Sequence, residues 1–203
     1  MNDFDAKAVT WDQDPLKVER ALTVGRAIAE AVPVANRQVL EYGCGTGLLG
    51  FVLQPQAAHV TLADTSEGML GVLDQKILAA GARNMTSLRL DLLADPLPAA
   101  RYDLICSLMT LHHIPDTDGL LRKFRELLAP GGWVALSDLD TEDGSFHGRE
   151  VTDVHLGFDR GVLGRQLEAA GFSSITFTTP YEIQRDLEGG QGRFPIFLVV
   201  AKR

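Results

Sequence analysis

The sequence predicts an α/β fold in which a doubly wound, mostly parallel seven-stranded sheet has an antiparallel last strand. Strand patterns alternate with helix patterns up to residue 139, and such alternation is typical of parallel sheets covered by helices on both faces. The strand patterns at 175–179 and 194–203 then follow one another with only a loop between them, which favours antiparallel pairing. A glycine-rich turn joins the first strand to a helix.

The length of 203 residues suits one domain, residues 1–203, with an N-terminal lid and helix (1–36) ahead of the core (37–203). The contents of 45% hydrophobic and 23% charged residues are those of a soluble globular protein. No apolar run approaches the roughly 20 residues of a membrane span. We therefore expect a cytoplasmic protein without a membrane partner, whose two cysteines form no disulfide.

The net charge of −8 argues against a nucleic-acid partner. Binding to phosphates needs lysines and arginines clustered on one face of the protein. The segment after the fourth predicted strand reads CSLMTLHH. It contains neither the Asn/Asp-Pro-Pro-aromatic motif nor the Pro-Cys motif of enzymes that modify nucleic acids. A small molecule is thus the expected partner, and the sequence does not indicate an oligomeric state.

The first predicted helix spans residues 14–32. Asp14 can cap it, Pro15 fits its first turn, and apolar residues recur at helical spacing. Ahead of this helix, Trp11 is an isolated aromatic residue in a polar segment. It either packs against the helix as a staple or belongs to a lid that contacts a substrate.

The first strand ends in the stretch VLEYGCGTGLLG, residues 39–50. An acidic residue, Glu41, precedes glycines at alternate positions, which are Gly43, Gly45 and Gly47. A backbone without side chains lets N–H groups approach a ligand closely at a strand-to-helix turn. The ligand should therefore lie at the end of the first strand.

The same stretch also satisfies G-x-G-x-x-G, the dinucleotide fingerprint, through Gly45, Gly47 and Gly50. In that fingerprint the glycines begin at the end of the strand. They would then start at Gly43, and Leu48 would stand where the third glycine is required. This register and the final antiparallel pair of strands disfavour the alternative of a nicotinamide-dependent oxidoreductase.

The pattern E-x-G-x-G-x-G resembles motif I of the class I S-adenosylmethionine (SAM)-dependent methyltransferases. The final strand pair resembles the end of their Rossmann-like sheet, so the resemblance extends in architecture over roughly residues 16–203. It implies that the loop binds the methionine part of SAM and that Glu41 helps to place the amino group. It also implies methyl transfer from SAM to a small-molecule acceptor. A SAM-binding protein without transferase activity remains an alternative, because fold does not fix chemistry.

The second predicted strand, 59–64, ends at Asp64. A carboxylate beside the glycine loop can accept hydrogen bonds from both hydroxyls of a ribose. Asp64 could instead cap the next helix, but Thr65 and Ser66 can already do so.

The third predicted strand, 85–93, contains Asp91, where the resemblance implies a contact with the adenine amino group. Met69 either covers a face of the adenine or packs in the core. The predicted cofactor-binding residues are Glu41, Gly43, Cys44, Gly45, Gly47, Asp64, Thr65, Met69, Asp91, Leu92 and Ser107.

Three histidines are candidates for catalysis or for positioning the acceptor: His112 and His113, after the fourth strand, and His155. Alternatively, they only stabilise their turns through backbone contacts. The sulfonium of SAM needs no acid, and the sequence shows no partner that would orient any of these histidines. We therefore expect alignment to dominate catalysis, with a modest contribution from one histidine.

The connection from 138 to 159 is long and polar, which favours a flap that binds the acceptor. We expect Trp11 and His147 to contact the substrate, and both the N-terminal segment and the flap to close over the site. The acidity of the flap favours a neutral or cationic acceptor. No His pair at i, i+4 and no CxxC motif is present, so a metal is not expected.

Overall fold

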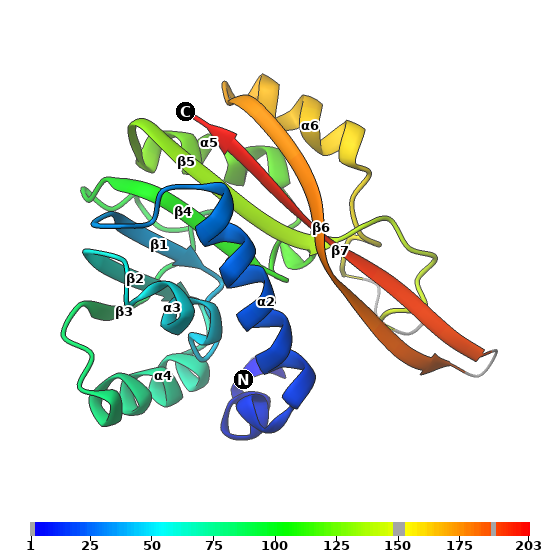
Figure 1. The fold of residues 1–203 in the computed structure, drawn as a ribbon, viewed down its shortest axis with the longest axis horizontal. Helices are drawn as coiled ribbons and strands as arrows, with labels where there is room; N and C mark the ends of the chain where they lie inside the picture. Colours follow the sequence, from blue (N-terminus) through cyan, green and yellow to red (C-terminus); the bar gives the residue numbers. More distant parts are fainter. Residues whose placement is uncertain (1–2, 148–152, 188–189) are drawn as a thin grey trace.

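The computed structural model describes residues 3–147, 153–187 and 190–203, which form an α/β fold (Figure 1). Its sheet has seven strands in the order β3-β2-β1-β4-β5-β7-β6. β7 runs antiparallel to β5 and β6, and the other neighbouring pairs are parallel. The predicted fold is confirmed. The strands are β1 (Gln38–Tyr42), β2 (His59–Asp64), β3 (Met85–Arg89), β4 (Tyr102–Leu108), β5 (Leu128–Leu139), β6 (Ser173–Leu187) and β7 (Gly190–Lys202).

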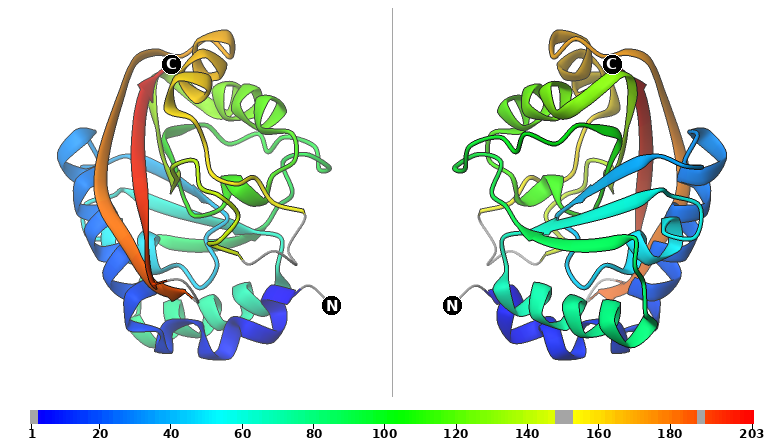
Figure 2. Two further views of the ribbon diagram at one scale, coloured as in Figure 1. Left: turned by 90° about the vertical axis from the view of Figure 1, so that its right-hand side faces the viewer. Right: turned by 90° about the vertical axis from the view of Figure 1, so that its left-hand side faces the viewer.

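Helices cover both faces of the sheet (Figures 1 and 2). α2, α3 and α4 pack on one face, and α5 and α6 pack on the other. Each helix buries an apolar stripe, such as Leu120 and Phe124 of α5, which are fully buried. The helices are α1 (Asp3–Lys7), η1 (Ala8–Gln13), α2 (Pro15–Ala31), α3 (Leu48–Leu53), α4 (Glu67–Ala80), η2 (Leu111–His113), α5 (Thr117–Leu127) and α6 (Arg160–Ala169).

Side-chain caps fix where two helices at the site begin. The carboxylate of Asp14 accepts a hydrogen bond from the backbone N–H of Leu16 at 3.0 Å, which starts α2 as predicted. The hydroxyl of Ser66 accepts from the backbone N–H of Met69 at 3.1 Å and so caps α4. Asp64 is therefore not the cap of α4.

The third strand is shorter than the predicted 85–93, because it ends at Arg89. Asp91 Oδ1 accepts hydrogen bonds from the backbone N–H groups of Leu93 at 2.9 Å and Ala94 at 3.3 Å. An aspartate that bonds its local backbone in this way starts a turn and competes with the strand ladder.

The last two strands are longer than predicted. The predicted strands at 175–179 and 194–203 leave the segment between them as a loop, because Pro180 and several glycines interrupt it. In the structure both strands continue through this segment, and a register shift between Thr178 and Tyr181 accommodates Pro180. A bulge is one of the few places within a sheet where proline fits.

We call the outer part of these strands, residues 181–187 and 190–195, the hairpin arm (Figure 1). β5 ends at Leu139, which pairs with Ile196 of β7, so the arm extends past the carboxyl end of β5. A small apolar cluster anchors the arm and consists of Leu139, Phe146, Ile183, Phe194 and Ile196. The arm therefore brings side chains of β6 to the carboxyl edge of the sheet.

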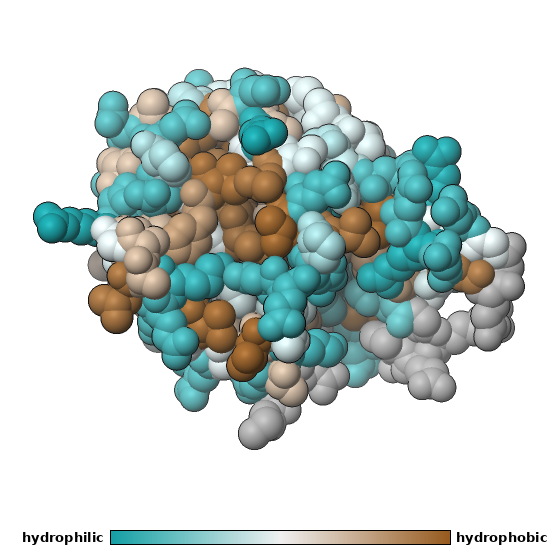
Figure 3. All heavy atoms as spheres, turned by 60° about the horizontal axis from the view of Figure 1, so that its bottom comes forward, coloured by the Kyte–Doolittle hydropathy of each residue, from teal (hydrophilic) through white to brown (hydrophobic). Residues whose placement is uncertain are grey.

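Within the described residues, no helix is long and apolar enough to cross a membrane. In the same part of the chain, no group of three or more His, Cys, Asp and Glu side chains is placed to hold a metal ion. On the face shown in Figure 3, hydrophobic atoms lie in separate groups between hydrophilic ones. Cys44 and Cys106 are buried free thiols, as predicted.

Candidate functional site

A cavity of about 820 Å³ lies at the carboxyl edge of the sheet. Its volume falls in the range of about 300–1,000 Å³ that is typical of ligand sites. The strands that line it are β2, β1 and β4 on one side and β6 on the other, and β5 and β7 stand between β4 and β6 in the sheet, so the cavity has two ends. The glycine-loop end is lined by Glu41, Gly43, Cys44, Gly45, Asp64, Thr65 and Met69. The histidine end is lined by Arg20, His112, His113, Phe146, His147, Ile183 and Arg185.

The glycine loop needs its glycines for different reasons. Gly43 has φ of 70°, and a Cβ there would lie 2.2 Å from Cγ2 of Thr110. Gly45 has φ of 53°, and a Cβ there would meet nothing nearer than Nε1 of Trp11 at 3.8 Å. Packing thus excludes a side chain at Gly43, whereas Gly45 borders open space in the cavity. This open backbone fits the predicted approach of a ligand.

Asp64 connects the glycine loop to the end of β2. Its Oδ2 accepts a hydrogen bond from the backbone N–H of Gly45 at 2.7 Å, and its Oδ1 accepts from the backbone N–H of Ser66 at 2.9 Å. A carboxylate offers about four lone-pair positions. Each oxygen therefore retains acceptor capacity toward the cavity, as the predicted contact with two ribose hydroxyls requires.

Glu41 is 2% exposed and lines the cavity. Its Oε2 is buried without a hydrogen-bond partner. Burial raises the pKa of Glu41 to about 8, and the nearby backbone of Gly50 offsets part of this shift. A buried oxygen without a partner needs an explanation, and a cationic ligand group at this end of the cavity would supply one.

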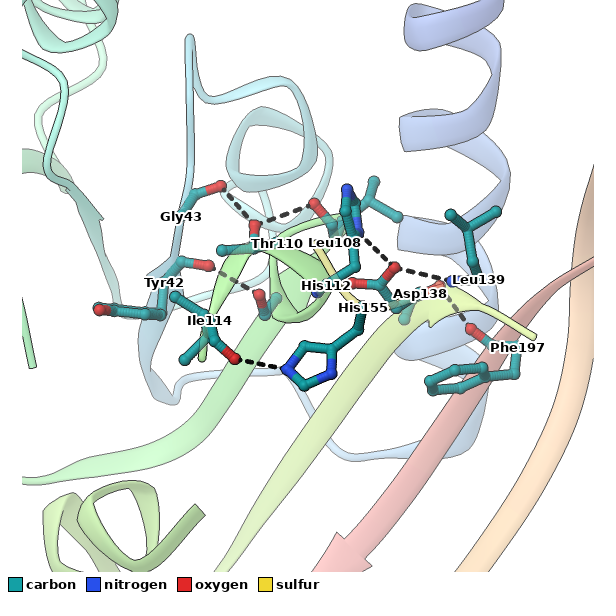
Figure 4. Close-up of polar contacts among 12 residues, drawn as sticks. Tyr42, Gly43, Leu108, Thr110, His112, Ile114, Asp138, Leu139, His155 and Phe197 are labelled. Atoms are coloured by element: carbon teal, nitrogen blue, oxygen red, sulfur yellow. Dashed lines mark hydrogen bonds and ion pairs between the residues drawn. The ribbon is translucent and has the colours of Figure 1, made fainter. Parts of the chain in front are cut away.

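His112 has an orienting partner that the sequence did not reveal. Its Nδ1 lies 2.6 Å from Oδ1 of Asp138, which is fully buried near the end of β5 (Figure 4). The backbone N–H groups of His112 and Leu139 also donate to this carboxylate, at 3.2 and 2.8 Å. Because an ionised carboxylate only accepts hydrogen bonds, it assigns the ring proton to Nδ1. Nε2 of His112 then keeps its lone pair.

Two further histidine rings contact His112. The ring centroids of His113 and His147 lie 4.1 and 4.9 Å from that of His112. Burial, with a contribution from the other two histidines, lowers the pKa of His113 to about 4. Burial also lowers the pKa of His147, and its Nε2 is buried without a hydrogen-bond partner. Both rings are therefore neutral at about pH 7 and form an uncharged wall.

Five residues of the predicted site lie outside the set that lines the cavity: Gly47, Asp91, Leu92, Ser107 and His155. Gly47 is the N-cap residue of α3, with φ of 80°. His155 donates from Nε2 to the carbonyl of Ile114 at 2.9 Å, which ties the end of the flap to η2 (Figure 4). Ser107 is buried and donates to the carbonyl of Tyr42 at 2.8 Å. Leu92 is fully buried in the core, and the Asp91 carboxylate bonds the backbone after it.

The N-terminal segment lies closed over the glycine-loop end. Asp5 accepts a hydrogen bond from the hydroxyl of Ser66 at 2.6 Å. Asp12 accepts from the hydroxyl of Thr46 and pairs with Lys76, both at 2.5 Å. These contacts place Phe4 and Trp11 on the cavity, as the lid prediction requires.

The flap also reaches the cavity, through Phe146 and His147. Glu142 accepts hydrogen bonds from the backbone N–H groups of Gly144 at 2.8 Å and Phe146 at 3.0 Å. Its carboxylate is thus bound by the flap itself. Residues 148–152, which belong to the predicted flap, lie outside the described residues.

Comparisons with known proteins agree with this geometry. A family profile described as a methyltransferase domain matches residues 17–176. The ubiquinone biosynthesis O-methyltransferase of Marinobacter nauticus is 34% identical over 122 residues, which cover 59% of this chain and 51% of that protein. The corresponding protein of Dechloromonas aromatica is 31% identical over 136 residues, which cover 66% of this chain and 55% of that protein. The chain thus spans about half the length of these curated relatives.

Solved structures show the same fold. The complex of DhpI with SAH has a TM-score of 0.73 at 24% identity and covers 98% of this chain and 92% of DhpI. A SAM-dependent methyltransferase from Aquifex aeolicus has a TM-score of 0.67 at 20% identity and covers 93% of this chain and 98% of that one. With the family match over residues 17–176, the strand order and the glycine loop, this chain belongs to the class I SAM-dependent methyltransferase family.

Proposed function

We propose that this chain transfers a methyl group from SAM to a hydroxyl oxygen of a small-molecule acceptor, with His112 as the general base. The observation that carries the proposal is the buried His112–Asp138 pair at 2.6 Å, in a cavity that also contains the glycine loop. The named relatives are O-methyltransferases, which supports an oxygen acceptor.

The glycine-loop end suits the parts of SAM. The unpartnered Oε2 of Glu41 would pair with the ammonium of the methionine part. The open backbone at Gly45 would pass beside the same part, and the remaining acceptor positions of Asp64 would take the ribose hydroxyls. Cys44, Thr65 and Met69 complete the wall of this end.

When bound, SAM supplies a methyl group on a sulfonium, which is already an excellent leaving group. The protein then has to align the acceptor, exclude water and remove the hydroxyl proton. Nε2 of His112 would take that proton, and the buried Asp138 carboxylate would stabilise the resulting imidazolium. The rings of His113 and His147 are neutral and would add no charge of their own beside His112. The N-terminal segment, which places Trp11 on the cavity, would limit access of water.

The proposal is tested with S-adenosylhomocysteine (SAH), NAD and labelled SAM. A ligand at 100 times its Kd adds about 2.7 kcal/mol to the free energy of unfolding. SAH should therefore raise the melting temperature clearly, and NAD should not. Label from SAM should then appear on a hydroxyl of a catechol acceptor. A shift with NAD alone would refute SAM dependence, and SAH binding without transfer to any hydroxyl acceptor would favour a non-catalytic SAM-binding protein.

Binding of SAH is expected to release a proton from Glu41. In the free protein the raised pKa, about 8, keeps this carboxyl protonated at about pH 7. Pairing with an ammonium favours the carboxylate, so roughly one proton is released and affinity rises up to about tenfold per pH unit below that pKa. Titration calorimetry in two buffers of different ionisation enthalpy measures the release. The Glu41→Gln variant has no such proton to lose, and equal heats for wild-type protein in both buffers would contradict the prediction.

Asp64→Ala should weaken SAH binding by about 1.5–3 kcal/mol, the range for hydrogen bonds to a charged group. It should also lower the free energy of unfolding by about 1–2 kcal/mol, because the N–H groups of Gly45 and Ser66 lose their acceptor. Asp74→Ala is a matched control on α4, since Asp74 accepts from Ser87 outside the cavity. Calorimetry and denaturant unfolding separate the two effects. Unchanged SAH affinity in Asp64→Ala would show that Asp64 only supports the loop.

A further inference from the structure

Two arginines line the histidine end of the cavity from different elements. Arg20 comes from α2, and Arg185 comes from the hairpin arm. Nε of Arg20 is buried without a hydrogen-bond partner. Among the described residues, neither arginine is ion-paired with a carboxylate, whereas Arg160 pairs with Asp140 and Arg193 pairs with Glu182. Arg20 is half-buried and Arg185 is exposed, and charged groups that leave water are normally paired, so the lack of a partner is most unusual for Arg20.

The carboxylates that act on Arg20 already have other partners. Asp14 pairs with Lys17 at 2.8 Å, and Asp138 bonds to His112 at 2.6 Å. Burial lowers the pKa of both Arg20 and Arg185, as expected for cations that leave water without a compensating anion. Glu142 of the flap accepts backbone hydrogen bonds through Oε2, and its Oε1 is buried without a hydrogen-bond partner. Its negative charge acts on His147 and not on either arginine. The histidine end therefore holds two guanidinium groups that are ion-paired with no carboxylate of the described residues.

Arg185 is held in a defined position. Its guanidinium lies 4.0 Å from the centroid of the Phe146 ring, and it donates to the carbonyl of Phe146 at 2.6 Å. The ring of His147 packs against Phe146 with centroids 4.8 Å apart. Phe4 packs against His113 in the same way at 5.3 Å. Flat rings with fixed cations beside them suit an aromatic ligand that carries an anion.

We propose that Arg20 and Arg185 form a carboxylate-binding subsite and that the methyl acceptor is a hydroxylated aromatic carboxylic acid. The proposal rests on the proposed function, because it names the acceptor of the same site. The acceptor ring lies against Phe146 and the histidines, its hydroxyl reaches His112, and its carboxylate lies between the two guanidinium groups. Guanidinium forks bind carboxylates through paired hydrogen bonds. This charge differs from the neutral or cationic acceptor that the acidity of the flap favoured in the sequence.

The carboxylate of SAM is a second possible source of the anion. Strand order argues against it for Arg185, because β6 lies four strands away from β1 and its glycine loop. With about 4.8 Å between neighbouring strands, that separation is roughly 19 Å. Arg20 lies on a helix that lines both ends of the cavity, so the experiment must measure cofactor and acceptor separately.

The test uses 3,4-dihydroxybenzoate and catechol, which share one hydroxylated ring and differ in the carboxylate. Each is titrated into SAH-saturated protein by calorimetry, and each is offered as acceptor with labelled SAM. Wild-type protein should bind the acid at least about tenfold more tightly than catechol. Arg185→Met and Arg20→Met should each reduce that preference about tenfold or more while SAH affinity holds. Arg193→Met on the arm and Arg26→Met on α2, both exposed outside the cavity, should retain it.

Each other outcome has a definite meaning. The proposed carboxylate subsite is refuted if wild-type protein does not bind the acid or shows no preference for it over catechol. It is also refuted if both Arg20→Met and Arg185→Met retain that preference. If Arg20→Met weakens SAH binding and leaves the preference intact, Arg20 binds the cofactor and the proposal is overturned. If Arg20→Met does not fold, Arg185→Met decides, because Arg185 lies on the exposed arm. If wild-type protein neither binds SAH nor transfers a methyl group to any acceptor, the proposed function itself is refuted.

Discussion

Replacing His112 with asparagine is expected to lower kcat by about 10²- to 10⁴-fold, the usual contribution of a general base. The amide of asparagine can donate to Asp138 from near the position of Nδ1, so the buried carboxylate keeps a partner, but no lone pair remains at the position of Nε2. Alanine would leave the buried carboxylate without its side-chain partner, which costs about 1–3 kcal/mol, and would confuse catalysis with folding. SAH affinity, measured by calorimetry, should stay unchanged.

Asp138→Asn tests the orienting role separately. An asparagine amide can turn its N–H₂ toward Nδ1 and so favour the wrong tautomer of His112. We expect kcat to fall about as much as in the His112 variant. The pH–rate profile should also lose the part in which the wild-type rate rises with pH. His155→Ala is the control, because His155 bonds the carbonyl of Ile114 outside the cavity lining. A loss below about tenfold in His112→Asn would show that alignment suffices, as the sequence had suggested.

The residues that local sequence could predict are those whose role depends on neighbours in the chain. The glycine loop and Asp64 follow directly from a strand end, and the structure brings both to one cavity. Asp138 could not be predicted in the same way. It meets His112 because β4 and β5 pair in a register that sets Leu108 opposite Ser137. That contact joins residues far apart in the chain, and only the aspartate near the end of the fifth strand hinted at it.

The place of Arg185 at the histidine end of the cavity could not be predicted from the sequence for a related reason. Proline and glycines made the hairpin arm resemble a loop, whereas the bulge between Thr178 and Tyr181 lets the strands continue and brings Arg185 to the cavity. His155, in contrast, was a candidate for catalysis beside the alternative of a contact that only stabilises its turn. The ring of His155 bonds a backbone carbonyl, a role that residue type alone cannot distinguish from catalysis. The partners of the charges in the flap could not be predicted either, since Glu142 bonds the flap's own backbone.

Gly43→Ala is expected to lower the free energy of unfolding by about 2–4 kcal/mol and to weaken SAH binding. Part of the loss is backbone strain, because φ at Gly43 is 70°, and the left-handed conformation costs an L-residue about 1–2 kcal/mol. The rest is steric, since the new Cβ would lie 2.2 Å from Cγ2 of Thr110, and overpacking costs about 1–3 kcal/mol. The loop would have to move away from the cavity to relieve the clash.

Gly81→Ala measures the cost of backbone strain without a steric clash. Gly81 caps α4 with φ of 60°, and a Cβ there would meet nothing within 4 Å. Its substitution should cost only about 1 kcal/mol, because a smaller unfolded-state entropy offsets part of the strain. The difference between the two variants in denaturant unfolding therefore measures the clash.

The clash itself can be tested with Thr110→Gly, which removes all three atoms that a Cβ at Gly43 would meet. In a double-mutant cycle, Gly43→Ala should cost about 1–3 kcal/mol less in the Thr110→Gly background than in the wild type. SAH affinity should recover with it, because the loop can return to its place beside Asp64. If Gly43→Ala costs no more than Gly81→Ala, or if the cycle shows no coupling, contact with Thr110 does not set the position of the glycine loop.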